Sequence, residues 1–326
     1  MIVSTHRWKA AASRVALSMA VLAAGAGAWA LPGARAAASE VPTAVWSAPV
    51  TGATDTTSVT FPSGLVVGVA TTGAVDLGAT STLGSRGWNA TSYGPTPMQT
   101  GDSAAALLVN TPSCASVGIC PDLGTVTVSF SRPVSNPVLH LAGIGGNARQ
   151  RTAQSELHSR YRLTGSTPPG AALQLEAGNG QLSVTGGDTI TAANSDTSPS
   201  CITAAAGGGS LSAAANAACG SVRIDGVVTS VTFDVDALFT QNAAATGPFN
   251  TATSADGVAL AVTVDQDLGD APGTYDAAGV ASHVVGDLQM GSAVGADDST
   301  SRNPTASPLA SPTAATDGDD ALASVP

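Results

Sequence analysis

The chain has 326 residues and carries 12 lysines and arginines against 23 aspartates and glutamates, which gives a formal net charge of −11. Because neutralising a phosphate backbone requires clustered lysine and arginine, this balance argues against a nucleic-acid-binding protein. Aromatic residues make up only 4% of the sequence, so a hydrophobic core has to be built mainly from valine, leucine, isoleucine and alanine.

The first 38 residues have the pattern of a secretory signal peptide. Arg7, Lys9 and Arg14 form a positively charged start, the apolar run 15–30 follows, and "ARAAASE" offers small-residue cleavage sites near 36–38. The alternative is a retained membrane anchor, but the apolar run is short for a membrane span. We therefore predict an exported protein that is soluble after cleavage, with no later membrane span.

Short β-rich runs separated by Gly, Pro, Asn, Asp and Ser clusters fill the chain from about residue 42 to 264. This pattern is typical of an all-β antiparallel sandwich, and about 220 residues suit one such domain. The predicted strands are 58–61, 64–73, 105–110, 124–130, 136–143, 172–177, 221–226, 230–236 and 257–264.

Alternation within two of these runs predicts which side chains face the core. Val126, Val128 and Phe130 alternate with threonine and serine, which indicates one buried and one solvated face. The run 230–236 repeats the pattern, with Val231, Phe233 and Val235 expected inward and Asp234 and Asp236 outward.

Four cysteines, an even number in an exported chain, favour disulfides over a zinc site. Three pairings are open, and we favour the local one, Cys114–Cys120 with Cys201–Cys219, because each pair brackets a loop rich in small residues. Closing loops this short stabilises a fold by roughly 2–3 kcal/mol per bond. The zinc alternative lacks C-x2-C spacing and a neighbouring histidine.

Composition changes after Val264. From residue 265 onward there are ten acidic residues and one basic residue, Arg302, and the end of the chain is rich in Ser, Thr and Pro. Such composition is typical of linkers or disordered segments, so we place a module boundary at about 265.

The stretch "GTVTVSFSRPVSNPVLHLAGIGG" (124–146), with "SCASVGICPDLG" (113–124) and "CGSVRIDGVVTSVTFDVD" (219–236), resembles the ligand-binding non-repetitive domain of CshA-type fibrillar adhesins. The resemblance covers most of 45–264. It implies a lectin-like β-sandwich on a bacterial surface that binds host or neighbouring-cell glycoproteins or glycans, with fibronectin as the family's type of target.

The acidic segment that follows resembles the beginning of a GEVED-type bacterial surface domain. The matching elements are Gly269 to Tyr275, Ser282-His283, "MGSAVGADD" (290–298) and "TDGDDA" (316–321). The family continues into further strands, and a C-terminal sorting signal is missing before Pro326. We therefore expect 265–326 to be a partial module of a shortened surface protein, whose anchoring signal lies outside this chain.

Two groups of residues are candidates for ligand binding. Trp88, Asn89 and Tyr93 lie in the Gly-rich stretch 84–94, which we expect to form an exposed loop whose aromatic rings stack on a sugar or anchor a protein contact. The alternative is that Trp88 caps the core.

Arginines form the second candidate group and the only positive cluster after the signal peptide. Arg149 and Arg151, with Arg160 and Arg162 nearby in sequence, could meet an acidic partner or sugar; the alternative is a solvated loop.

Asp265, Asp267 and Asp270 are the best metal candidates, because calcium prefers carboxylate and carbonyl oxygens. The spacing fails the calcium-loop pattern, so solvated turn aspartates are the alternative. We expect no cofactor other than calcium.

Signals for catalysis are weak. Ser103 in "GDS" lacks a G-x-S-x-G elbow, "HLAGIGGNA" (140–148) is followed by no amphipathic helix, and His140 is expected to pack against the sheet. We therefore predict a binding protein that is not an enzyme, with a structural stalk component and a secreted hydrolase as alternatives.

Overall fold

The computed structural model describes residues 39–40, 45–61, 63–82, 92–94, 102–111, 114, 118–145, 155–192, 217–241, 255–268 and 282–284. These residues all belong to one compact unit, 36–326. They contain no helix with the length and apolar character that spanning a membrane requires.

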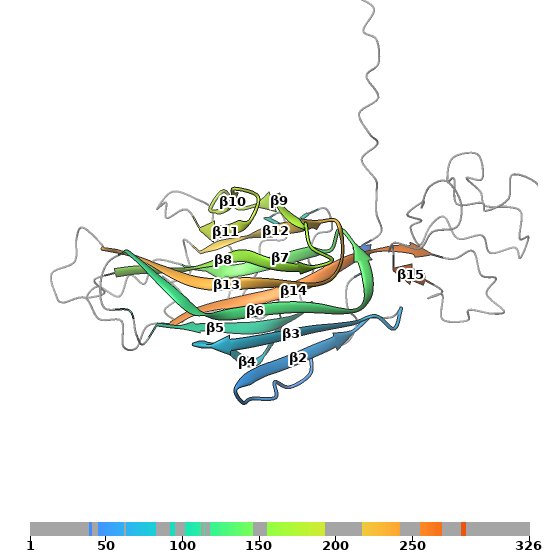
Figure 1. Cartoon of the computed structure of the whole chain (residues 1–326), viewed down its shortest axis with the longest axis horizontal. Helices are drawn as coiled ribbons and strands as arrows, with labels where there is room; N and C mark the ends of the chain where they lie inside the picture. Colours follow the sequence, from blue (N-terminus) through green and yellow to red (C-terminus); the bar gives the residue numbers. More distant parts are fainter. Residues whose placement is uncertain are drawn as a thin grey trace, which may run out of the picture. The chain divides into compact units, whose positions relative to one another are not determined.

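The unit is built from β-strands (Figure 1). They are β1 (Ser39–Glu40), β2 (Thr54–Thr60), β3 (Val66–Gly73), β4 (Val75–Thr82), β5 (Ser103–Asn110), β6 (Gly118–Ser135), β7 (Val138–Ile144), β8 (Ser155–Thr167), β9 (Ala172–Gly178), β10 (Leu182–Thr185), β11 (Thr189–Ala192), β12 (Ala218–Asp225), β13 (Val227–Gln241), β14 (Ala255–Leu268) and β15 (Ser282–Val284).

Two antiparallel sheets make up the fold, as the alternating pattern predicts. Sheet 1 has the order β4-β5-β14-β7-β12-β9, and β1 and β15 pair with the far end of β14. Sheet 2 has the order β10-β11-β8-β13-β6-β3-β2. The strands of both sheets run in similar directions in Figure 1, the aligned packing of a β-sandwich.

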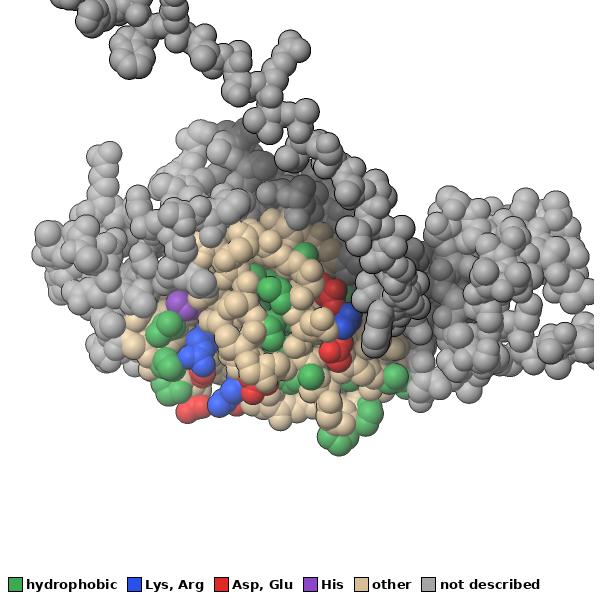
Figure 2. All heavy atoms as spheres, turned by 90° about the horizontal axis from the view of Figure 1, so that it is seen from above, with side chains coloured by type: hydrophobic (Ala, Val, Ile, Leu, Met, Phe, Trp, Pro, Cys, Tyr) green, Lys and Arg blue, Asp and Glu red, His purple; other side chains and the backbone are tan. Residues whose placement is uncertain are grey.

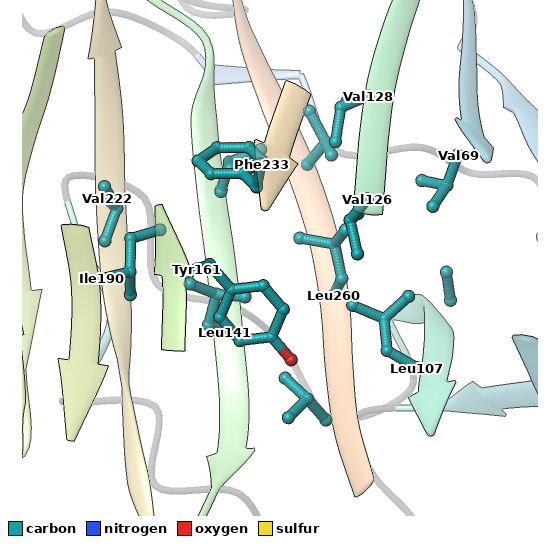
Figure 3. Close-up of a cluster of buried hydrophobic side chains, with 14 of the residues drawn as sticks. Val69, Leu107, Val126, Val128, Leu141, Tyr161, Ile190, Val222, Phe233 and Leu260 are labelled. Atoms are coloured by element: carbon teal, nitrogen blue, oxygen red, sulfur yellow. The ribbon is translucent and has the colours of Figure 1, made fainter. Parts of the chain in front are cut away.

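The core lies between the sheets and consists of their inward-facing side chains. Val126, Val128 and Phe233 of sheet 2 share one buried cluster with Leu141 and Leu260 of sheet 1. Figure 3 shows side chains from several strands meeting in this cluster. The expected inward faces of 124–130 and 230–236 are thus confirmed.

Each of the nine predicted strands overlaps an observed strand, and the predicted bounds differ from the observed ones by a few residues at one or both ends in most cases. Six observed strands were not predicted from the sequence: β1, β4, β8, β10, β11 and β15. Arg160 and Arg162 therefore lie on a strand, and the solvated-loop alternative is wrong for these two arginines. The boundary at 265 stays a prediction; β14 runs across that position.

The predicted bond between Cys114 and Cys120 is confirmed, with Cα atoms 5.5 Å apart. Cys219 is also disulfide-bonded. Its expected partner, Cys201, lies outside the described residues.

Candidate binding groove on the outer face of sheet 2

The outer face of sheet 2 carries hydroxyl and charged side chains, because its strands alternate core residues with threonine, serine and ionisable residues. We call this surface the open face, and it includes Thr72, Thr125, Thr127, Arg160, Arg162, Thr164, Thr191, Thr232 and Asp234. Neighbouring hydroxyls pair across strands: Thr72 Oγ1 lies 2.8 Å from Thr125 Oγ1, and Thr127 Oγ1 lies 3.1 Å from Thr232 Oγ1. Short side chains of this kind leave the surface of the sheet accessible.

The open face is hollowed where β10, β11, β8 and β13 meet. The groove has a volume of about 390 Å³, within the roughly 300–1,000 Å³ typical of small-molecule sites. The described residues that line it are His158, Arg160, Thr185, Thr189, Thr191, Ala192 and Leu238.

Strand register explains why these residues meet. His158 of β8 pairs with Leu238 of β13, and Thr185 of β10 pairs with Thr189 of β11. Figure 2 shows positive and negative side chains next to one another on the face that it draws. The described lining of the groove therefore offers apolar surface, hydroxyls and one permanent cation.

Arg160 is the unusual member of this lining. Arg132 donates to the Ser63 carbonyl at 3.0 Å, Arg162 donates to Asp234 at 3.0 Å, and Arg223 donates to Asp225 at 2.6 Å. Arg160 Nη2 instead lies 3.8 Å from Asp236 Oδ2, beyond hydrogen-bonding distance. Among the arginines that the structure describes, Arg160 alone donates no hydrogen bond from its side chain to another described residue.

A second polar cluster lies on the outer face of sheet 1, where it is buried. His140 is 1% exposed, and its Nδ1 and Nε2 lie 2.8 Å from the hydroxyls of Ser221 and Thr263. Burial lowers the pKa of His140 to about 3, so the imidazole is neutral. We call this surface the covered face; it also includes Tyr93, Ala104, Ala142, Cys219 and Ala261.

The contact between Ser221 and His140 has the distance of a nucleophile–base pair, but its surroundings do not suit catalysis. Ser221 is fully buried, and its hydroxyl also accepts a hydrogen bond from the Gly94 amide at 3.1 Å. A nucleophile must reach substrate, and a base must hold a proton near neutral pH. The cluster instead links β7, β12 and β14 across sheet 1.

Asp256 ties the two sheets together at one end of the sandwich. Its carboxylate accepts hydrogen bonds from the Gly145 amide at 3.0 Å and from the amide and hydroxyl of Ser159 at 2.8 and 2.7 Å. Burial raises the pKa of this carboxyl above its ordinary value, although the bonds from Ser159 and Gly145 act in the opposite direction. Gly145 is required here, because its φ is +67° and an added Cβ would lie 2.6 Å from the His158 Cβ.

The structure corrects one expectation about the predicted ligand-binding residues. Tyr93 is 5% exposed, and its ring centroid lies 6.0 Å from that of His140 in an edge-on arrangement. The expected exposed ring is therefore wrong for Tyr93, because packing over the His140 cluster removes it from solvent. Trp88, Asn89, Arg149 and Arg151 lie outside the described residues.

The proposed calcium ligands are described only in part. Asp265 and Asp267 lie on β14, where their backbones pair with Ser39 and His283, and Asp270 lies outside the described residues. The described part of the chain holds no group of three or more His, Cys, Asp or Glu residues placed to bind a metal.

Ser103 also takes a structural position at the start of β5. It is 5% exposed, and its hydroxyl accepts a hydrogen bond from the Trp46 amide at 3.0 Å. The sequence singled out Ser103 and, among the arginines, Arg160, but it gave no sign of Asp256 or of the other groove residues, which come from four strands and share no local motif.

Comparison of the chain with models of protein families, with curated proteins and with solved structures found no match.

Proposed function

We propose that this chain is an exported adhesin-type protein that binds a glycan or glycoprotein at the groove on the open face. The observation that carries the proposal is the groove itself, about 390 Å³ in volume, with Leu238 and Ala192 as apolar lining and Arg160 and three threonines as polar lining. Sugars present both C–H surfaces and hydroxyls, so a mixed lining of this kind suits them.

The rest of the described chain supports binding without covalent chemistry. His140 and Asp256 are buried titratable groups, and each is held by hydrogen bonds that join strands. The groove adds Arg160, which suits recognition better than proton transfer because a guanidinium stays protonated.

The sequence resemblance supplies the biological setting of the proposal. A CshA-like sandwich at 42–264 followed by a GEVED-like segment from 265 would place the chain on a bacterial surface, with a host or neighbouring-cell glycoprotein such as fibronectin as its partner. The site proposed here is on the sheet, whereas the sequence pointed to loops.

A groove-filling substitution tests this proposal. Thr185 is exposed and lines the groove, so Thr185→Trp should fill it, and Thr60→Trp on β2 places the same ring on the same sheet outside the groove. We expect the wild type and Thr60→Trp to bind on a glycan array or to immobilised fibronectin, and Thr185→Trp to bind at least about tenfold more weakly, a loss of about 1.4 kcal/mol. Absence of binding in both formats would favour a structural stalk component instead.

A further inference from the structure

We infer that the groove takes a sugar residue that bears a carboxylate, and that Arg160 binds this carboxylate. The inference rests on the proposed function and specifies its ligand class. Arg160 has more hydrogen-bond donors than its described neighbours use, because a guanidinium has five N–H groups. The planar arrangement of these groups matches the two oxygens of a carboxylate.

Asp236 does not use up these donors. Its Oδ2 lies 3.8 Å from Arg160 Nη2, and its Oδ1 accepts a hydrogen bond from the Asp122 amide at 3.2 Å. The Asp236 side chain is only 9% exposed, whereas 23% of the Arg160 side chain remains accessible to a ligand. Asp236 therefore positions the guanidinium without forming a hydrogen-bonded pair.

The remaining lining completes a site for a ring with one acidic substituent. Among the described residues that line the groove, none is acidic and Arg160 is the one permanent cation. Thr185 and Thr191 offer hydroxyls that can donate to or accept from ring hydroxyls, and Leu238 gives apolar surface for ring C–H groups. When the carboxylate of the sugar binds Arg160, the sugar ring lies over the threonines and Leu238.

Arg162 provides a matched control on the same strand. It lies two residues from Arg160 on the same face, but its Nη2 is hydrogen-bonded to Asp234 at 3.0 Å, and it does not line the groove. Removing either positive charge changes the net charge equally. A difference between the two variants therefore reports on the groove and excludes a general electrostatic effect.

The test uses glycan pairs that differ in a carboxylate: glucuronic acid against glucose, and sialyllactose against lactose. Binding of the secreted chain is measured for the wild type, Arg160→Gln and Arg162→Gln. We expect the wild type to prefer an acidic member, Arg160→Gln to lose about 10- to 100-fold in affinity for it, and Arg162→Gln to change less than about threefold. Which pair shows the effect distinguishes a uronic acid from a sialic acid.

The outcomes separate this inference from the proposed function. Equal binding of acidic and neutral members, with loss on Thr185→Trp, would overturn the carboxylate inference and leave glycan binding in place. Equal losses in Arg160→Gln and Arg162→Gln would also overturn it. Binding to none of the glycans or to fibronectin would overturn both.

Discussion

On the covered face of sheet 1, His140 is 1% exposed and each ring nitrogen has a hydroxyl partner at 2.8 Å. On the open face of sheet 2, Arg162 is exposed and pairs with Asp234 at 3.0 Å, while threonine hydroxyls pair with one another. Both faces contain polar side chains that contact one another across strands. Water reaches only the second.

This difference in solvent exposure matters because it determines how much stability is lost when a hydrogen bond is removed. A buried donor or acceptor that loses its partner keeps the full desolvation penalty, about 1–3 kcal/mol, whereas an exposed group turns to water. The covered face can therefore hold the fold, and the open face can carry a binding site that varies without unfolding the protein.

The largest expected effect comes from His140→Ala on the covered face. The variant removes a buried ring and leaves the hydroxyls of Ser221 and Thr263 without it, so we expect the free energy of unfolding to fall by about 3–5 kcal/mol. Urea unfolding at pH 7 with the disulfides intact measures this loss. Arg162→Ala on the open face is the control, with an expected loss below about 1 kcal/mol; similar losses in both variants would remove the distinction between the faces.

Acid should weaken the covered face selectively. The pKa of His140 is about 3 in the folded chain and about 6.5 in an unfolded one, so the unfolded state takes up the proton first. Stability from this group is complete above pH 6.5 and is lost as the pH falls toward 3. Between pH 7 and 4 we expect a contribution of about 3 kcal/mol to this loss, at about 1.4 kcal/mol per pH unit.

His140→Gln measures that contribution, because glutamine is polar and does not titrate. Urea unfolding at pH 7 and pH 4 should show a smaller acid-induced loss in this variant than in the wild type. Asp256→Asn should do the reverse: the raised pKa of Asp256 makes its contribution fall as pH rises above about 3.9, so it partly offsets the histidine. Unchanged pH dependence in both variants would contradict the assignment.

Much of the sandwich could be predicted from the sequence, because period-two alternation is a local signal. Val126, Val128 and Phe130 alternate cleanly, and their strand was predicted correctly. In β8, Arg160 and Arg162 flank Tyr161, so the stretch looks like a charged loop until β13 supplies aspartates opposite both arginines. The pairing of β8 with β13 joins residues far apart in the sequence, so the residues of β8 alone do not predict it.

The groove, assembled from four strands, and the buried contacts elsewhere in the sandwich were harder to predict for the same reason. Asp256 precedes Gly257, a pair of residues typical of a turn. Asp256 links the two sheets only because Ser159 of the other sheet donates a hydrogen bond to its buried carboxylate. Tyr93 lies in a Gly-rich stretch typical of exposed loops, and only the His140 cluster explains its burial. Neither contact has a sequence motif.

The smallest expected effect is on the open face, in the hydroxyl pair of Thr127 and Thr232. Their oxygens lie 3.1 Å apart, and both residues are half-buried on neighbouring strands. In a double-mutant cycle with Thr127→Val and Thr232→Val, we expect a coupling energy below about 0.5 kcal/mol, because water replaces the lost partner and valine is as favourable in a strand. A coupling energy above about 1 kcal/mol would mean that the hydroxyl pairs stabilise the open face, as the hydrogen bonds of His140 stabilise the covered face. Substitutions on the open face would then cost more stability than its exposure to solvent predicts.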